Sequence, residues 1–404
     1  MFDVEEARSR FPALTRSSNG RTVAYFDGPG GTQVPRSVIE AMQRPLEEGV
    51  SNLGGVFASS RLADEITAGA RQAGADLFGA SEADEIVFGQ NMTSLTFAMS
   101  RALARTWQPG DRIVVTSLDH DANISPWLLA AADAGVEVDM ARFDSASFQL
   151  HAGVIEELLT DRTRLVAITH ASNAFGTIPD VAAIARAAHS VGALVYVDAV
   201  HYAAHGPIDV RAMGADFLVA SAYKFHGPHT GMLCGQRDFL EDLEAYKVRP
   251  APDHGAGKWE TGTQSFESLA GVTAAVDYLA GLGAGATRRQ RILDGHRRVH
   301  EYLSPLVDYF LANRGDHVTL YGIDGGAGRT PTFAVNVDGL DARTVAARLA
   351  EDGLLVWDGH YYAVEPMRQI GLLDSGGAVR IGFVHTTTAE EVDRLVDSLA
   401  ALKR

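Results

Sequence analysis

Lys224 is the residue whose type and position most strongly suggest chemistry. It follows the apolar run Phe217-Leu218-Val219-Ala220, among the small and aromatic residues of Ser221-Ala222-Tyr223-Lys224-Phe225. Burial disfavours a charged amine, so a lysine at the end of a buried strand is costly unless it is paired or covalently used. The alternative is a lysine that extends to solvent from the strand end.

Asp198 is the second candidate, because it ends another apolar run, Ala193-Leu194-Val195-Tyr196-Val197. The carboxyl ends of parallel strands are where α/β sheets build their sites. The alternative for Asp198 alone is a helix N-cap or a loop acid. A lysine that forms a Schiff base and an aspartate that pairs with a pyridinium nitrogen are the protein groups that pyridoxal 5′-phosphate (PLP) most needs, so the pair favours PLP chemistry.

The elements that must position these residues follow from the hydrophobic pattern. Between residues 80 and 235, runs that are apolar on both faces alternate with Ala-rich helical segments, which is typical of buried parallel strands and their crossover helices. After residue 265 the pattern changes to long helices and fewer strands. We therefore predict an α/β fold with a large domain over residues 1–265, built on a mainly parallel doubly wound sheet, and a smaller α+β domain over 266–404. The predicted strands cover 85–88, 112–115, 165–168, 193–197, 217–220, 332–337 and 354–357, and the predicted helices include 181–191, 287–313 and 389–403.

Charge and composition exclude several classes of partner. The 35 Lys and Arg residues against 51 Asp and Glu give a net charge of −16, which repels nucleic acid. No apolar run is long enough to span a bilayer and the start lacks a secretory signal, so we expect a cytoplasmic protein without a membrane contact. The spacings of His226 with His229 and of His201 with His205 could suit a metal, but no acidic or cysteine partners accompany them, and no metal is expected.

Several further segments occur in a recognisable order: Arg10-Phe11-Pro12-Ala13-Leu14, Ala24-Tyr25-Phe26-Asp27, the stretches 85–88, 119–127 and 169–177, and Glu260-Thr261-Gly262-Thr263. With Asp198 and Lys224, they make the chain resemble the class V aminotransferase family of fold-type I PLP enzymes. The resemblance covers nearly the whole chain and is closest to the cysteine desulfurase and selenocysteine lyase branch. Each motif alone would be weak, and their shared order and spacing make the resemblance specific.

The resemblance implies roles for the residues around the cofactor ring. Lys224 would hold PLP as a Schiff base, and Asp198 would pair with the pyridine nitrogen, which favours the protonated ring that withdraws electrons. His120 would stack on the ring and assist proton transfer; the alternative is a histidine that caps the helix near Asn123. Asn173 would lie near the phenolic oxygen and the substrate carboxylate. His201 replaces the family's usual glutamine, so its hydrogen bond to that oxygen is expected to respond to pH.

Other positions would bind the phosphate and the substrate. Thr93, with Met92 at the start of a helical segment, matches a phosphate ligand, as a helix N-terminus would favour. Ser221 would add a hydroxyl, and Tyr223 stands where the desulfurases usually have a histidine. Thr263 matches a threonine that reaches the phosphate from the neighbouring subunit, which implies a homodimer with shared sites. For the substrate, Arg380 would grip the α-carboxylate through two parallel hydrogen bonds, and Gly30 would line the pocket.

The chain departs from the desulfurase pattern at one decisive place. A desulfurase needs a cysteine on a C-terminal loop, because a thiolate must carry the sulfur away as a persulfide. In the corresponding segment, 357–367, Tyr361 stands at or next to that position, between His360 and Tyr362. The single cysteine, Cys234, lies in a pattern typical of a buried strand, where a structural thiol is expected.

The departure predicts a PLP-dependent C–S lyase that works by β-elimination and needs no persulfide cysteine. Lys224 would serve as base, and the candidate acids are His120, His360, Tyr361 and Tyr362. The products from a cysteine-like substrate would be pyruvate and ammonia. The alternatives are an aminotransferase or epimerase of the same family and, in another class, a cofactor-free scaffold that binds proteins.

Overall fold

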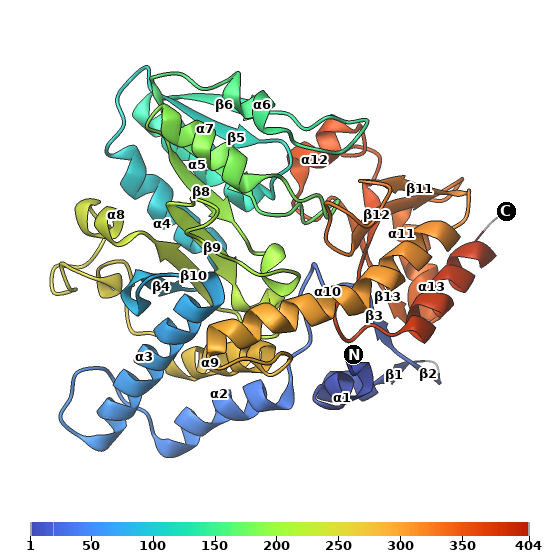
Figure 1. The fold of residues 1–404 in the computed structure, drawn as a ribbon, viewed down its shortest axis with the longest axis horizontal. Helices are drawn as coiled ribbons and strands as arrows, with labels where there is room; N and C mark the ends of the chain where they lie inside the picture. The colour runs from blue at the N-terminus through green and yellow to red at the C-terminus, as the bar shows by residue number, and fades with distance from the viewer. Residues whose placement is uncertain (1, 19, 403–404) are drawn as a thin grey trace.

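A seven-stranded sheet organises the larger part of the molecule in the computed structural model, which describes residues 2–18 and 20–402 (Figure 1). Its strand order is β4-β10-β9-β8-β7-β5-β6, and the five neighbouring strands from β9 to β6 pair in parallel. Strand β10 runs antiparallel to both β4 and β9. The bounds are β4 Ile86–Gly89, β5 Arg112–Thr116, β6 Glu137–Ala141, β7 Thr163–Thr169, β8 Leu194–Asp198, β9 Phe217–Ser221 and β10 Gly231–Gly235.

Helices cover both faces of this sheet, and each face has its own apolar core. Alternate residues of one strand divide between the cores: Val195 and Val197 pack in one, and Tyr196 packs in the other. This alternation is why the strands are apolar on both faces in the sequence. One face carries α2 Arg36–Glu48, α3 Ala58–Phe78, α6 Ala152–Glu156, α7 Val181–Ser190 and α9 Phe266–Ala280, and the other carries α4 Met92–Ala104, α5 Ser125–Ala134 and α8 Arg237–Asp242.

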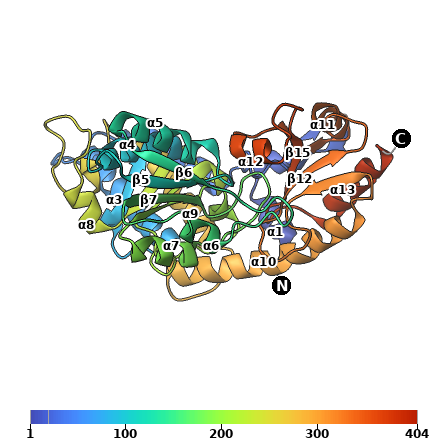
Figure 2. The same cartoon turned by 90° about the horizontal axis from the view of Figure 1, so that it is seen from above.

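A four-stranded antiparallel sheet, in the order β11-β12-β15-β14, forms the second part of the molecule. Figure 2 shows α10 running beneath both parts, from the large sheet to the small one. A short pair, β3 with β13, joins the N-terminal arm to the small part. The bounds are α1 Val4–Ser9, β1 Ser17–Ser18, β2 Arg21–Thr22, β3 Ala24–Tyr25, α10 Arg288–Asn313, β11 Val318–Tyr321, β12 Thr332–Val337, α11 Ala342–Glu351, β13 Leu354–Leu355, β14 Trp357–Gly359, α12 Val364–Gln369, β15 Ala378–Gly382 and α13 Ala389–Ala401.

The predicted α/β fold with a mainly parallel sheet is confirmed, and so are the five predicted strands of the large sheet. The predicted strand 354–357 is wrong in detail: it is interrupted at Val356, with β13 pairing with β3 before it and β14 pairing with β15 after it. Of the predicted helix 389–403, Lys403 lies outside the described residues. The predicted domain boundary after residue 265 stays a proposal. Two elements cross it: α9, which follows residue 265, packs on α2 and α3 beside the large sheet, and Phe26, which precedes it, belongs to the core of the small part.

Candidate active site

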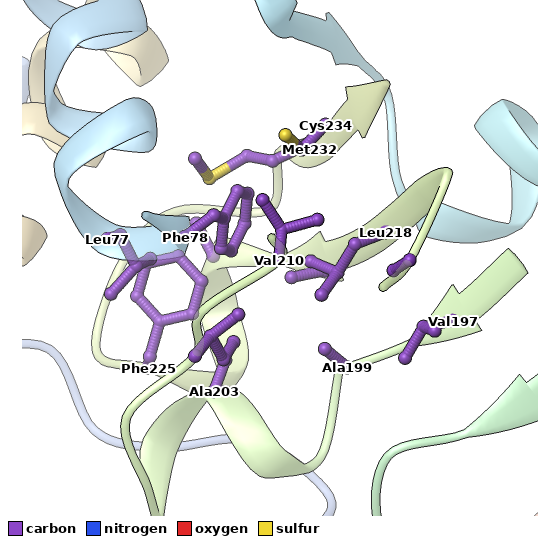
Figure 3. Close-up of a cluster of buried hydrophobic side chains, with 14 of the residues drawn as sticks. Leu77, Phe78, Val197, Ala199, Ala203, Val210, Leu218, Phe225, Met232 and Cys234 are labelled. Carbon is purple, nitrogen blue, oxygen red and sulfur yellow. The ribbon is translucent and has the colours of Figure 1, made fainter. Parts of the chain in front are cut away.

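Lys224 lies in the turn that connects β9 to β10, at the edge of the sheet where the parallel strands end. Its ammonium points inward and donates to the carbonyl oxygens of Pro29 and, at 3.1 Å, Gly30. The next residue, Phe225, is fully buried and anchors the turn in the core (Figure 3). Burial, with Arg380 as a second cause, lowers the pKa of Lys224 to about 7. The alternative of a lysine extending to solvent is wrong.

Asp198 ends β8, between the ends of β7 and β9, and lines the same cavity as Lys224. Its carboxylate accepts a hydrogen bond of 2.9 Å from the backbone N–H of Val200. Burial raises the pKa of Asp198 to about 6, against the opposing effects of that hydrogen bond and of Lys224. The cavity has a volume of about 1030 Å³, at the upper end of the range for small-molecule sites.

His120 has the capping contact of the alternative reading and also lines the cavity, while its role beside a cofactor ring stays a prediction. Its Nδ1 accepts the backbone N–H of Ala122 at 3.0 Å, so it caps a short helical turn, and its ring also lines the cavity. Because Nδ1 is an acceptor, the neutral ring carries its proton on Nε2. Burial lowers the pKa of His120 to about 3. The structure thus favours His120 as a neutral hydrogen-bond donor.

The N-terminus of α4 forms one end of the cavity. Asn91 caps the helix, and Met92 and Thr93 open it beside Ser221, whose hydroxyl oxygen accepts the N–H of Met92 at 3.0 Å. A helix start offers free N–H groups and the positive end of the dipole to an anion. Met92, Thr93, Ser221 and Tyr223, the residues predicted to bind a phosphate, all line the cavity.

Arg380, on β15, approaches the cavity from the small sheet and faces Asp27, a residue that the sequence reasoning did not single out. One terminal nitrogen of Arg380 lies 3.1 Å from the Asp27 carboxylate, and the other donates to the Asn173 carbonyl at 3.3 Å. The Nε of Arg380 and the Oδ1 of Asn173 are buried without a protein partner. Gly30 leaves room for Asp27, since a Cβ there would lie 2.2 Å from a carboxylate oxygen. The Gly-Pro-Gly-Gly turn that follows Asp27 was the available signal.

His201 lines the cavity and is held from behind by two threonines. Its Nε2 lies 3.0 Å from the Thr330 hydroxyl and 3.1 Å from the Thr332 hydroxyl. Burial holds the pKa of His201 well below its usual value. Burial thus disfavours the charged form of His201 and opposes the expected pH response of this histidine.

The segment that replaces the cysteine loop brings aromatic rings to the cavity. Tyr361 is buried, donates its hydroxyl hydrogen to the Ala378 carbonyl, and lies under the Arg380 guanidinium. Tyr362 is 67% exposed and stacks on His120 with ring centroids 5.6 Å apart. Both tyrosines line the cavity, together with Trp357, which the sequence reasoning did not assign. His360 is not among the lining residues, and instead accepts the N–H of Tyr362 through Nδ1.

Two further predicted positions lie outside the cavity. Thr263 is exposed and does not line it within this chain. Cys234 lies on β10 with 2% of its surface exposed, packed with Met232 in the core (Figure 3). Burial raises the pKa of the Cys234 thiol, which disfavours the nucleophilic thiolate. In the described part of the chain, no group of three or more acidic, histidine or cysteine side chains could hold a metal ion, and no helix is long and apolar enough to cross a membrane.

Comparisons with known proteins agree with this geometry. Residues 24–395 match the family model for the class-V aminotransferases. A cysteine desulfurase of Pectobacterium atrosepticum is 30% identical over 100% of this chain and 98% of its own, and an aminotransferase-like protein of Gibberella zeae is 32% identical over 98% of both. The solved apo structure of a cysteine desulfurase from Thermococcus onnurineus superposes with a TM-score of 0.88 at 26% identity, covering 98% of this chain and 97% of that one.

Proposed function

The chain belongs to the class-V aminotransferase family of PLP-dependent enzymes, and from that premise we propose that it is a C–S lyase acting on a cysteine-like amino acid by β-elimination. The observation that carries the proposal is the burial of the single cysteine: Cys234 lies in the core, where a thiol is not accessible to a substrate. The loop at the cavity carries tyrosines instead of a cysteine. A persulfide on a protein cysteine therefore has no suitable carrier among the described residues.

The residues that line the cavity fit PLP. Lys224 supplies the amine, Asp198 the carboxylate for the ring nitrogen, His120 a flat ring, and the start of α4 the N–H donors for a phosphate. The buried and unpartnered Oδ1 of Asn173 is a polar atom that a ligand in the cavity would satisfy. When bound, PLP supplies an electron sink for the pair left at the substrate's α-carbon.

Lys224 and Arg380 supply the base and the carboxylate-binding group of the proposed reaction. With a pKa of about 7, the Lys224 amine is partly unprotonated at neutral pH and can take the α-proton at little cost. Arg380 exchanges its contact with the Asp27 carboxylate for one with the substrate carboxylate. The Cβ–S bond then breaks, the sulfur leaves with its electron pair and takes a proton, and the three-carbon fragment adds water to give pyruvate and ammonia.

Tyr362 is the acid that we propose for the departing sulfur. Its ring lines the cavity and its hydroxyl has no hydrogen bond to the described part of the chain, so its proton is available. Tyr361 commits its hydroxyl to Ala378, and burial raises its pKa. His120, as a neutral ring, is a weaker proton donor, and His360 lies off the cavity.

The test is a survey of products. With S-substituted cysteines, we expect pyruvate, ammonia and the free thiol in equal amounts. The Cys234→Ala variant should keep the wild-type rate within about twofold, because the thiol only packs in the core. An activity that vanishes with Cys234, or cysteine consumption that yields alanine and no pyruvate, would contradict the proposal. Conversion of the cofactor to its amine form with an α-keto product, or exchange of the α-hydrogen without elimination, would point to the aminotransferase or epimerase alternative.

A second test addresses Arg380. Replacing it with lysine keeps the charge and removes the planar fork, so we expect KM for the amino acid to rise about 10- to 100-fold while kcat changes less. Steady-state kinetics at fixed pH measure both. A matched control is Arg343→Lys, on the exposed face of α11, which should change neither constant. An unchanged KM for Arg380→Lys would remove this residue from carboxylate binding.

We also propose a homodimer with shared sites. Thr263 is exposed in the single chain and lies off its own cavity, which is the arrangement expected if it serves the partner's phosphate site. The cytoplasmic location stays a prediction from the sequence.

A further inference from the structure

We propose that His229 provides a side-chain hydrogen bond to the cofactor's phosphate, and that Tyr223 serves as the surface on which the His229 ring is held. The inference rests on the family's cofactor and is independent of the fate of the substrate.

The geometry of the β9–β10 connection places His229 at the phosphate end of the cavity. Ser221 and Gly231 are register partners at the two ends of this connection. Gly231 packs directly on the helix cap of α4, since a Cβ there would lie 2.4 Å from the carbonyl carbon of Asn91. His229, two positions earlier, lines the cavity together with Asn91 and Thr93.

Tyr223 fixes the orientation of the His229 ring. The two rings stack with centroids 4.8 Å apart and an interplanar angle of 11°. The Lys224 ammonium lies 4.8 Å from the centroid of the same tyrosine ring. Tyr223 thus contacts both His229 and the lysine that carries the cofactor, and a stacked ring loses little further freedom when it binds an anion.

The negative charge of a phosphate favours a basic side chain as its partner. A phosphate monoester carries about −1.5 to −2 charges at pH 7, whereas the side chains at the start of α4 are neutral. Among the described residues that line the cavity, Lys224 is held by backbone carbonyls and Arg380 by Asp27. The basic side chains of the lining are Lys224, Arg380, His120, His201 and His229.

The two other histidines of that set cannot take the role. Burial lowers the pKa of His120 and of His201, so both stay neutral. His229 is solvent-exposed, and its ring is stacked on Tyr223. It is therefore the remaining basic side chain of the lining that can contact a phosphate beside the N–H groups of α4.

The experiment compares two probes, PLP and pyridoxal, which lacks the phosphate. Each is titrated into the full-length apoprotein, and Kd is measured from the cofactor's absorbance. We expect His229→Ala to weaken PLP about 10- to 100-fold, the size of a lost hydrogen bond to a charged group, with pyridoxal unchanged. His229→Arg should recover most of the PLP affinity.

The control is His254→Ala, an exposed histidine that pairs with Glu241 and should leave both constants unchanged. The proposal is overturned if His229→Ala binds PLP within about twofold of the wild type. It is equally overturned if PLP and pyridoxal weaken by the same factor, because that result would mean a structural defect in the turn. Because the titration needs no amino-acid substrate, its failure leaves the lyase proposal untouched.

Discussion

Replacement of Lys224 by alanine is expected to lower kcat by about 10³-fold or more and to remove the visible absorption band of the bound cofactor. In the proposed function the amine is both the attachment point and the proton acceptor, and a positioned base alone contributes about 10²- to 10⁴-fold. Its pKa of about 7 is the physical basis, since burial has removed much of the cost of holding the amine unprotonated. Turnover and absorbance spectra of the purified variant measure the two effects.

Two comparison variants separate amine chemistry from charge and from folding. Lys224→Arg keeps a cation but has no nucleophilic amine, so we expect it to be as inactive as Lys224→Ala. Lys247→Ala removes a lysine that pairs with Asp253 outside the site, and it should keep the wild-type rate and spectrum. The melting temperature of Lys224→Ala should not fall, because the variant relieves a desolvated amine. Retention of the band together with more than about 1% of the rate would refute the central role of Lys224.

Mild acid is expected to destabilise the fold strongly. Four histidines that we call the histidine cluster, His205, His226, His296 and His385, lie together behind the Lys224 turn. The rings of His226 and His385 are 4.7 Å apart, and His385 also bonds the Tyr278 hydroxyl at 2.6 Å. One ring nitrogen each of His205, His226 and His296 is buried without a partner. A proton on any of these rings would therefore be poorly solvated.

The direction of the effect follows from the pKa values. Burial lowers the pKa of His226 and of His296 to about 4, that of His205 to about 3, and that of His385 well below its usual value. The unfolded chain, with ordinary values near 6.5, binds more protons, so stability is lost as the pH falls below about 6.5.

The magnitude is large compared with the stability of a typical protein. At pH 5, a buried histidine with a pKa of about 4 costs about 2 kcal/mol. Asp119 and Asp198 oppose this, because burial raises their pKa values to about 8 and about 6, so each folded carboxyl gains a proton as the pH falls. The four histidines of the cluster, together with His120 and His201, outnumber these two carboxyls, so we expect a net loss that is a substantial part of a total stability of about 5–15 kcal/mol.

Urea unfolding at pH 7.5, 6 and 5 measures this loss. In His296→Gln, the slope of stability against pH should become smaller, because one buried group no longer titrates. His254→Gln, at an exposed position, should follow the wild-type curve. A wild-type stability that stays constant from pH 7.5 to pH 5 would show that the cluster accepts protons without strain.

The sequence by itself determined the fold class, the cofactor and most of the residues that line the cavity. Strands that are apolar on both faces can only be buried between helix layers, and a lysine and an aspartate at the ends of two such strands must meet at one edge of the sheet. Lys224, Asp198, His120, Asn173 and Arg380 therefore line one cavity, as their motifs predicted. The absence of a cysteine in the loop is likewise a property of the sequence alone.

Only the tertiary structure decided the hydrogen-bond partners and the protonation states of those groups. Asp27 and Arg380 are far apart in the chain and meet because β15 delivers the arginine from the small sheet to the N-terminal turn. The neutral state of His201 comes from burial behind two threonines, and the stacking of His229 on Tyr223 depends on the path of the β9–β10 connection. Protonation and partner choice are set by desolvation and by contacts between distant segments, and these are quantities that local sequence patterns do not encode.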